Sequence, residues 1–393
     1  MKDTRRQFLK KSAAAAGSVW VAPIVLAAPA KIYKAAVIGR TGGGDYGHGL
    51  DTIFNGLENV KVVAVADENP DGLKQAVSRA GADRGYADYH EMLKKERPEL
   101  VSIAPRQPDC HKDMALAAIE VGAHLYMEKP FTETPAEADE ILTAASAKGL
   151  KIAVAHTKRF MDHFLVIRNL LREKYLGDVL EVRFQGKQDS RVGGEDLYVL
   201  GVHDMDMMRF WFGDPLWCFA GVTQEGLDIS TEDIHRGQEP YLVAGDTIHA
   251  DYQFNHNIHV GWMSVKAPGW NSNLKIQDKT VTKWGFEIFG TKRVLSHQES
   301  VGTFILDSPF LVTGDPNVKW KPLSDVATLA PNERPGHPIR NLIHAIETND
   351  SPMCSGEDAR WAVEMVCAIY LAQRARSRIS FPLDVRENPL LNF

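Results

Sequence analysis

The sequence has few cysteines and no excess of positive charge. Only four of its 393 residues are cysteines, at Cys110, Cys218, Cys354 and Cys367. They form no CxxC pair and show no zinc-like spacing with histidines, so no metal site is predicted. Buried free thiols are the favoured interpretation, and a disulfide stays open. The net charge is −6 and the basic residues are scattered, which argues against a nucleic-acid partner.

Long apolar runs are also missing after residue 30. No stretch there reaches the roughly 18 apolar residues of a membrane span, so we expect none in the mature chain. The first residues are different: the Arg5-Arg6 pair precedes an alanine-rich apolar stretch that ends in small residues. We expect residues 1–30 to be a twin-arginine signal peptide and the mature protein to be periplasmic. The alternative is a basic start to an amphipathic helix.

Residues 31–155 alternate between short apolar runs and stretches with helical periodicity. The apolar runs cover residues 34–38, 60–66, 100–104, 125–127 and 152–155. After the first run and a glycine-rich turn, helical spacing is shown by Leu50, Ile53, Phe54 and Leu57. Strands that alternate with helices predict an α/β domain with a parallel, doubly wound (Rossmann) sheet.

Residues 156–393 follow another pattern. Strand-like runs cover residues 179–186, 246–254, 258–265, 285–289 and 293–296. The tip of a hairpin is predicted at 255–257, between two of them. Helices are expected near 162–175, around 339–346 and from Ser355 onward. Hairpins imply an antiparallel sheet, so a second, α+β domain is predicted.

The glycine-rich turn after the first strand is a candidate dinucleotide site. Backbone N–H groups of such a turn approach a pyrophosphate at the start of a helix. The best candidates are Gly39, Gly42 and Gly47, with Gly43 and Gly44 interchangeable with Gly42 because the spacing is expanded. Asp67 ends the second strand, where an acid can accept bonds from ribose hydroxyls and favour NAD. Arg40 could instead hold the 2′-phosphate of NADP. A purely structural glycine loop is the third interpretation.

Further motifs occur in an order that resembles a known family. In chain order they are the glycine turn, Asp67, Pro105 with His111, Glu128-Lys129-Pro130, Lys158-Arg159-Phe160, Leu176-Gly177-Asp178-Val179, Gly201-Val202-His203-Asp204-Met205-Asp206 and Gly356-Glu357-Asp358-Ala359-Arg360. This order is similar to that of the glucose–fructose oxidoreductase, inositol dehydrogenase and rhizopine-catabolism (Gfo/Idh/MocA) family. The likeness covers nearly the whole mature chain, and the Glu-Lys-Pro tripeptide is its most specific part.

The resemblance implies a fold, a cofactor and a class of substrate. Family members join an N-terminal Rossmann domain to a C-terminal open-faced antiparallel sheet, through which they commonly form dimers or tetramers. They bind NAD(H) or NADP(H) and act on sugars, polyols and their derivatives. We therefore expect a cofactor domain at 31–155, a substrate and oligomerisation domain at 156–393, and NAD as the cofactor with NADP as the alternative.

The resemblance also implies roles for individual residues. Lys129 falls on the catalytic lysine of the family and His203 on its catalytic histidine, and Asp206 matches the aspartate three residues later. Pro105, His111 and Glu128 are candidate cofactor contacts, and for His111 a helix-start role stays equally open. Many members carry an aspartate four residues before the histidine, but this chain has Val199.

These residues suit the oxidation of an alcohol. The unperturbed pKa of a histidine lies near neutrality, so His203 suits the base that takes the hydroxyl proton. Lys129 can stabilise the developing alkoxide. Asp206 lies at i+3 from His203 on a predicted helix, close enough to orient the imidazole. Arg159 is a candidate contact for substrate hydroxyls, with an ordinary salt bridge as the alternative.

Three functions are compatible with this set of residues. The first is an NAD(P)-dependent oxidoreductase for a sugar, polyol or glycoside hydroxyl, whose tightly bound cofactor is recycled in the site. The second is a redox-neutral NAD-dependent glycosidase that oxidises, eliminates and re-reduces, using the same lysine and histidine. The third is a non-catalytic binder that keeps NAD as a structural part.

Overall fold

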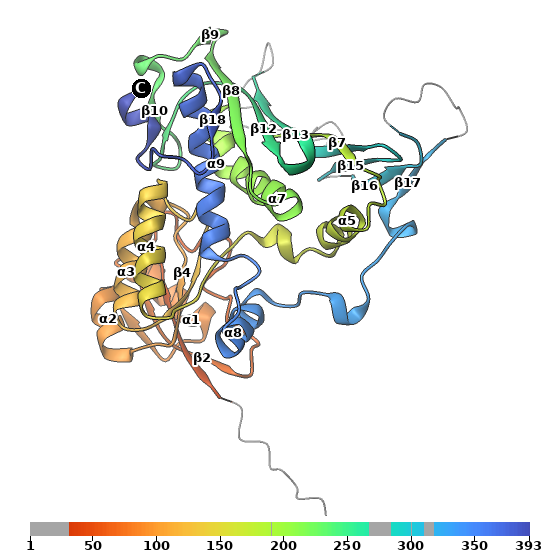
Figure 1. Cartoon of the computed structure of the whole chain (residues 1–393). Coiled ribbons are helices and arrows are strands. Elements are labelled where there is room, and N and C mark those ends of the chain that lie inside the picture. The colour runs from red at the N-terminus through yellow and green to blue at the C-terminus, as the bar shows by residue number, and fades with distance from the viewer. Residues whose placement is uncertain (1–30, 190, 267–283, 300, 310–317) are drawn as a thin grey trace, which may run out of the picture. The chain divides into compact units, whose positions relative to one another are not determined.

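A computed structural model of the chain describes residues 31–189, 191–266, 284–299, 301–309 and 318–393. Residues Tyr33–Phe393 form one compact unit (Figure 1). The expected signal peptide lies outside the described residues. Within the described ranges, no helix is both long and apolar enough to cross a membrane.

Six parallel strands form the N-terminal sheet, which confirms the predicted Rossmann architecture. The strands are β1 (Tyr33–Ile38), β2 (Val60–Ala66), β3 (Arg84–Tyr86), β4 (Leu100–Ile103), β5 (His124–Met127) and β6 (Ile152–Val154). Their order, β3-β2-β1-β4-β5-β6, reverses its direction between β1 and β4. In open α/β sheets, ligands bind outside the carboxyl ends of the strands at this switch point.

Both faces of this sheet are covered. Successive residues of β1 join two different apolar clusters, Ala36 and Ile38 in one and Val37 in the other. The helices of this region are α1 (Pro70–Ala80), α2 (Tyr89–Glu96), α3 (His111–Glu120) and α4 (Pro135–Ala147). Because both faces are buried, the strands are almost wholly apolar, which is what made them readable in the sequence.

The C-terminal helices return to the N-terminal sheet. Helix α8 (Pro338–Thr348) contributes Ile339 and Leu342 to the same cluster as Val37 (Figure 1). Directly before helix α9 (Gly356–Ala375), Ser355 pairs with Ala153 of β6. Residues far beyond the domain boundary expected at residue 155 therefore pack against the N-terminal sheet.

One predicted helix is absent. Residues 50–57 form a series of turns, such as the one closed by Thr52 N–H to the Gly49 carbonyl at 3.0 Å. Gly49 and Gly56 have φ of 81° and 75°, in the left-handed region that interrupts a helix. Leu50 and Phe54 are buried all the same, so the apolar spacing reports the core and not the local conformation.

The second sheet has ten strands and is mixed. Its order is β17-β16-β15-β14-β7-β13-β12-β8-β18, with β9 paired to β8, and every pair is antiparallel except β13 with β7. The strands are β7 (Val179–Gln185), β8 (Trp217–Gln224), β9 (Leu227–Asp228), β12 (Thr247–Phe254), β13 (Ile258–Val265), β14 (Gly285–Gly290), β15 (Val294–Gln298), β16 (Gly302–Leu306), β17 (Trp320–Pro322) and β18 (Ile379–Ser380). The short strands β10 (His235–Arg236) and β11 (Leu242–Val243) pair separately. The predicted hairpin is confirmed by the Phe254–Ile258 pair of β12 and β13.

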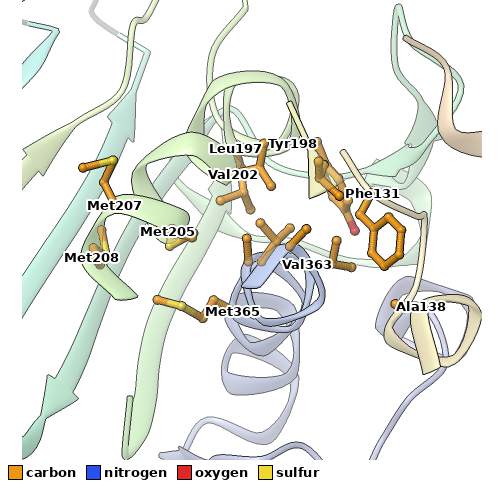
Figure 2. Packing of buried hydrophobic residues seen from close by; sticks show 14 of the residues in the cluster. Phe131, Ala138, Leu197, Tyr198, Val202, Met205, Met207, Met208, Val363 and Met365 are labelled. Carbon is orange, nitrogen blue, oxygen red and sulfur yellow. The ribbon is translucent and has the colours of Figure 1, made fainter. Parts of the chain in front are cut away.

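Helical segments between β6 and β8 build one side of the site. Helix α5 (Asp162–Arg172) ends three residues before the predicted end, and α6 (Gly194–Asp196) is a single turn. A π-helical turn, Leu197–Gly201, then leads directly into α7 (Val202–Phe212). Figure 2 shows Leu197 and Val202 close to Val363 of α9, so apolar packing fixes this junction.

Candidate active site

Lys129 lies at the carboxyl edge of the parallel sheet, two residues beyond the end of β5. Its side chain is 3% exposed, and Nζ donates a hydrogen bond of 3.0 Å to the Val199 carbonyl. Among the described residues, no carboxylate lies within ion-pair distance of this ammonium group. Burial lowers the pKa of Lys129, and the charge of Glu128 only partly offsets this. A buried lysine of this kind is available for proton transfer.

The π-helical turn places the Val199 carbonyl against Lys129. Its wider spacing is marked by the hydrogen bond from Val202 N–H to the Leu197 carbonyl, five residues back. Such turns frequently occur at functional sites. At the position where many family members have an aspartate, this chain therefore offers Lys129 a neutral main-chain oxygen.

His203 lies at the start of α7 and is half-buried. Its Nδ1 has no hydrogen-bond partner among the described residues. Burial holds the pKa of His203 well below its usual value, and the nearby charge of Lys129 adds to this. The imidazole is therefore neutral at pH 7, as a proton acceptor must be.

Asp206 and Arg159 bind each other. Arg159 Nη2 and Nε lie 2.7 and 2.9 Å from the two carboxylate oxygens of Asp206, and both side chains are buried. The same guanidinium donates to the Met353 carbonyl at 2.8 Å and lies 3.3 Å from Asp358. The expectation that Asp206 orients the ring of His203 is wrong, because Arg159 occupies the carboxylate. Arg159 takes its alternative role, a buried salt bridge between α7 and the start of α9.

His156 is a site residue that the sequence did not indicate. It follows β6, it is 1% exposed, and its ring meets that of His203 edge to face at a centroid distance of 5.4 Å. A signal was available, since His156 follows the last predicted strand of the sheet as Lys129 follows the strand before it. Lone histidines at strand ends are common, so this position alone did not stand out.

The glycine turn is packed as a dinucleotide turn requires. A Cβ atom on Gly39 would lie 2.1 Å from the ring of Tyr46, and one on Gly47 would lie 2.7 Å from the Ala104 carbonyl. Of the interchangeable glycines, Gly44 is the packed one, because its Cβ would meet the backbone nitrogen of Arg106 at 2.6 Å. Gly42 has open space around it, so its role in close approach passes to Gly44.

A cavity of about 270 Å³ adjoins this turn on the β2 side. Its lining includes Gly39, Arg40, Asp67, Glu68, Tyr89 and Met114. The carboxylate of Asp67 already accepts bonds from Thr41 Oγ1 at 2.6 Å and the Tyr46 hydroxyl at 2.7 Å. The ribose contact expected of Asp67 is thus occupied by protein groups, while Glu68 beside it is exposed.

Arg40 forms an ion pair with a residue across this cavity. Its Nη1 lies 2.9 Å from Asp109 Oδ1, and Asp109 raises the pKa of the guanidinium. This pairing leaves Arg40 poorly placed to hold a 2′-phosphate, which supports NAD.

The remaining predicted cofactor residues meet at the ends of β4 and β5. His111 is fully buried, and its ring nitrogens lie 2.7 Å from the Pro105 carbonyl and 3.0 Å from the Phe131 carbonyl. His111 therefore ties two strand ends together and has no nitrogen left for a ligand. Glu128 Oε1 bonds to His48 of the glycine turn, and its buried Oε2 has no described partner. An unpartnered carboxylate oxygen beside a glycine cradle fits a bound dinucleotide.

Comparison with known proteins identifies the N-terminal part. Residues 33–156 match the model of the Gfo/Idh/MocA oxidoreductase family, described as an NAD-binding Rossmann fold. This part of the chain is therefore similar to the family that the order of the sequence motifs resembles. The match supports the Rossmann fold and NAD as the dinucleotide of this domain.

Individual proteins and solved structures also resemble this chain beyond the Rossmann domain. The chain is 28% identical over 178 residues to oxidoreductase P35 of Formosa agariphila, covering 41% of this chain and 55% of that protein. It is 25% identical over 263 residues to scyllo-inositol 2-dehydrogenase (NADP(+)) IolW of Bacillus subtilis, covering 62% and 69% of the two chains. A solved levoglucosan dehydrogenase in complex with NADH and L-sorbose matches with a TM-score of 0.69 at 16% identity, covering 90% of this chain and all of the other. These matches support the fold of both sheets.

Proposed function

We propose that this chain is an NAD(P)-dependent oxidoreductase that oxidises a secondary hydroxyl of a sugar, polyol or glycoside. The observation that carries the proposal is the proximity of the buried Lys129 and the half-buried His203 at the carboxyl edge of the Rossmann sheet. Among the described residues, neither side chain is paired with a carboxylate. Relatives named as acting on inositol and levoglucosan support the substrate class.

Each residue has a defined task in this reaction. The nicotinamide ring supplies the hydride acceptor. His203 takes the hydroxyl proton, because its lowered pKa leaves the imidazole neutral. Lys129 donates to the oxygen as negative charge develops there, and the Val199 carbonyl holds its Nζ in place. The dry surroundings strengthen both interactions.

A second candidate is a redox-neutral glycosidase that uses the same residues. It is favoured by Val199, since an apolar side chain stands where many dehydrogenases of the family carry a carboxylate. Transient oxidation would acidify a neighbouring C–H bond, and a base would remove that proton as the glycosidic bond breaks. Water would then add to the resulting unsaturated ketone before the ketone is reduced back. Its product is a free sugar without a change in oxidation level.

Export by the twin-arginine route is part of this proposal. A periplasmic enzyme has no supply of free dinucleotide, so the cofactor must stay bound and be regenerated in place. We also propose a dimer or tetramer formed through the open face of the ten-stranded sheet.

The test is the chemistry of the purified, exported protein. Denaturation should release close to one dinucleotide per chain, identified by mass and absorbance. Loaded protein should then reduce its cofactor with at least one sugar, polyol or glycoside, and the products separate net oxidation from cleavage. If the protein neither retains a dinucleotide nor binds one that is added back, both candidates are contradicted.

A further inference from the structure

His156 is a buried histidine without a described hydrogen-bond partner on either ring nitrogen. Buried polar atoms in folded proteins are nearly always bonded, so an exception calls for an explanation. Packing alone does not give one, because an apolar side chain of similar size would avoid the cost of burying two polar atoms. His111, also fully buried, shows the structural alternative, with both nitrogens facing carbonyl oxygens.

The sheet register places His156 beside the catalytic residues. Met127 of β5 pairs with Val154 of β6, and Lys129 and His156 each follow two residues later. From there the imidazole of His156 meets that of His203 edge to face at 5.4 Å. Three nitrogen bases thus lie near one another, each supplied by a different segment.

The two histidines differ in the charges that face them. After burial, the strongest influences on the pKa of His203 come from Lys129, His156, Lys158 and His48, whose charged forms oppose a positive ring, and no carboxylate is among them. His156 is also opposed by Lys129 and Arg159, but the carboxylates of Asp206 and Asp358 favour its protonation. A proton is therefore held better on His156 than on His203, although burial works against both.

We propose that His156 is a positioning residue for the proton: it receives the substrate's hydroxyl proton from His203, and returns it in the reverse reaction. This rests on the proposed function. The hydroxyl O–H bond breaks as the hydride leaves the carbon that bears this hydroxyl for the cofactor. The proton passes to His203, and from there through one bridging water to His156. His203 is thereby restored to its neutral form beside Lys129, where an imidazolium would be least stable.

The first test uses substitutions in the cofactor-loaded enzyme. His156→Gln should lower kcat on the order of 10- to 100-fold, with KM nearly unchanged. This loss should be smaller than the loss caused by removing His203, the base itself. The acid limb of the pH profile should move to lower pH, because His203 alone then decides it. In His156→Gly, added imidazole should restore part of kcat. His163→Gln is the matched control, since His163 on α5 also has an unpartnered Nε2 but lies outside the site, and its kcat should stay unchanged.

Two results would overturn the proposal. One is a folded His156→Gln enzyme with wild-type kcat and pH profile. The other comes from NMR titration of the histidine rings in the loaded wild-type protein, which needs no substrate: His203 titrating at higher pH than His156 would reverse the assigned direction of transfer. If the wild type reduces its cofactor with no hydroxyl compound, the proposed function fails, and the titration still decides whether the proton rests on His156.

Discussion

Two buried lysines in this protein have opposite surroundings. Lys158 Nζ lies 3.0 Å from Glu299 and 3.3 Å from Asp204, and although burial acts against it, these carboxylates raise its pKa. Lys129 has only the Val199 carbonyl, and burial lowers its pKa. The same side chain is thus held charged at one place and made ready to lose its proton at the other.

The difference extends to the neighbours of each lysine. We call the residues around Lys158 the paired network, which comprises Lys158, Asp204, Glu299, Arg159 and Asp206, because every charge in it faces an opposite one. We call Lys129, His156 and His203 the unpaired cluster. Paired buried charges fix the geometry of a fold, whereas unpaired groups with shifted pKa values mark functional sites. The predictions below test this separation.

The largest effect is expected from Lys129→Met. Loss of the cation should lower kcat by about 10²–10⁴ in a loaded enzyme. The melting temperature should not fall, because the variant removes a buried amine that has no carboxylate partner. Steady-state kinetics and thermal unfolding of the same preparation measure both. A destabilised but active variant would place Lys129 in the paired network instead.

Arg159→Met should act in the reverse manner. It leaves the buried carboxylate of Asp206 without its partner, so the free energy of unfolding should fall by about 3–5 kcal/mol. Urea unfolding measures this loss. The double variant Arg159→Met with Asp206→Asn is the control, and it should recover part of the stability. A single variant as stable as the wild type would show that the pair does not hold α7 to α9.

Asp196 gives a prediction for pH. It directly precedes the π-helical turn, its Oδ1 is unpartnered, and burial raises its pKa to about 7 although Ser264 donates to it. The unfolded carboxyl ionises near pH 4 and the folded one only near 7, so stability should be lost as pH rises across this window. Roughly three pKa units correspond to about 4 kcal/mol.

The comparison is with Asp196→Asn, which cannot ionise. Urea unfolding at a series of pH values should show the decline between pH 4 and 7 in the wild type and its absence in the variant, so that the variant gains relative stability as pH rises. Parallel curves for the two proteins would mean that Asp196 ionises normally in the fold.

Val199→Asp should produce the smallest and most specific change. A carboxylate next to Lys129 should raise the pKa of the lysine by about 1–3 units, and with it the alkaline limb of the pH–rate profile. Val199→Asn, which adds a polar group without charge, is the control and should leave that limb in place. An unshifted limb in both variants would show that Lys129 does not control the alkaline side of the reaction.

The parts of this molecule that could be predicted from sequence are those fixed by local patterns. The runs of β1, β2, β4, β5 and β6 are mostly apolar and buried, and Lys129 lies two residues beyond the end of β5. The exposed strand β3 (Arg84–Tyr86) lacks such a run and was not predicted. The cap at Ser355 was also readable, since its side chain and that of Asp358 form the reciprocal capping bonds. Each of these features is determined by residues that are close together in the sequence.

The errors arose where distant contacts decide. Asp206 lies at the right spacing to orient His203, but Arg159 from another segment occupies it. Asp67 ends β2 as a ribose ligand should, but Thr41 and Tyr46 of the expanded turn bind it first. His156 acquires its place only through the pairing of β5 with β6. Spacing along the chain cannot show which of two partners binds a side chain.

The central claim is that the unpaired cluster performs hydride chemistry on a carbohydrate hydroxyl. We would load the wild type and Lys129→Met with NAD⁺, mix each with a panel of sugars, polyols and glycosides, and follow the absorbance of reduced nicotinamide in a single turnover. We predict that the wild type reduces its cofactor with at least one compound and that the variant does so at least about 100-fold more slowly. Equal rates in the two proteins, or no reduction by the loaded wild type with any compound, would contradict the claim.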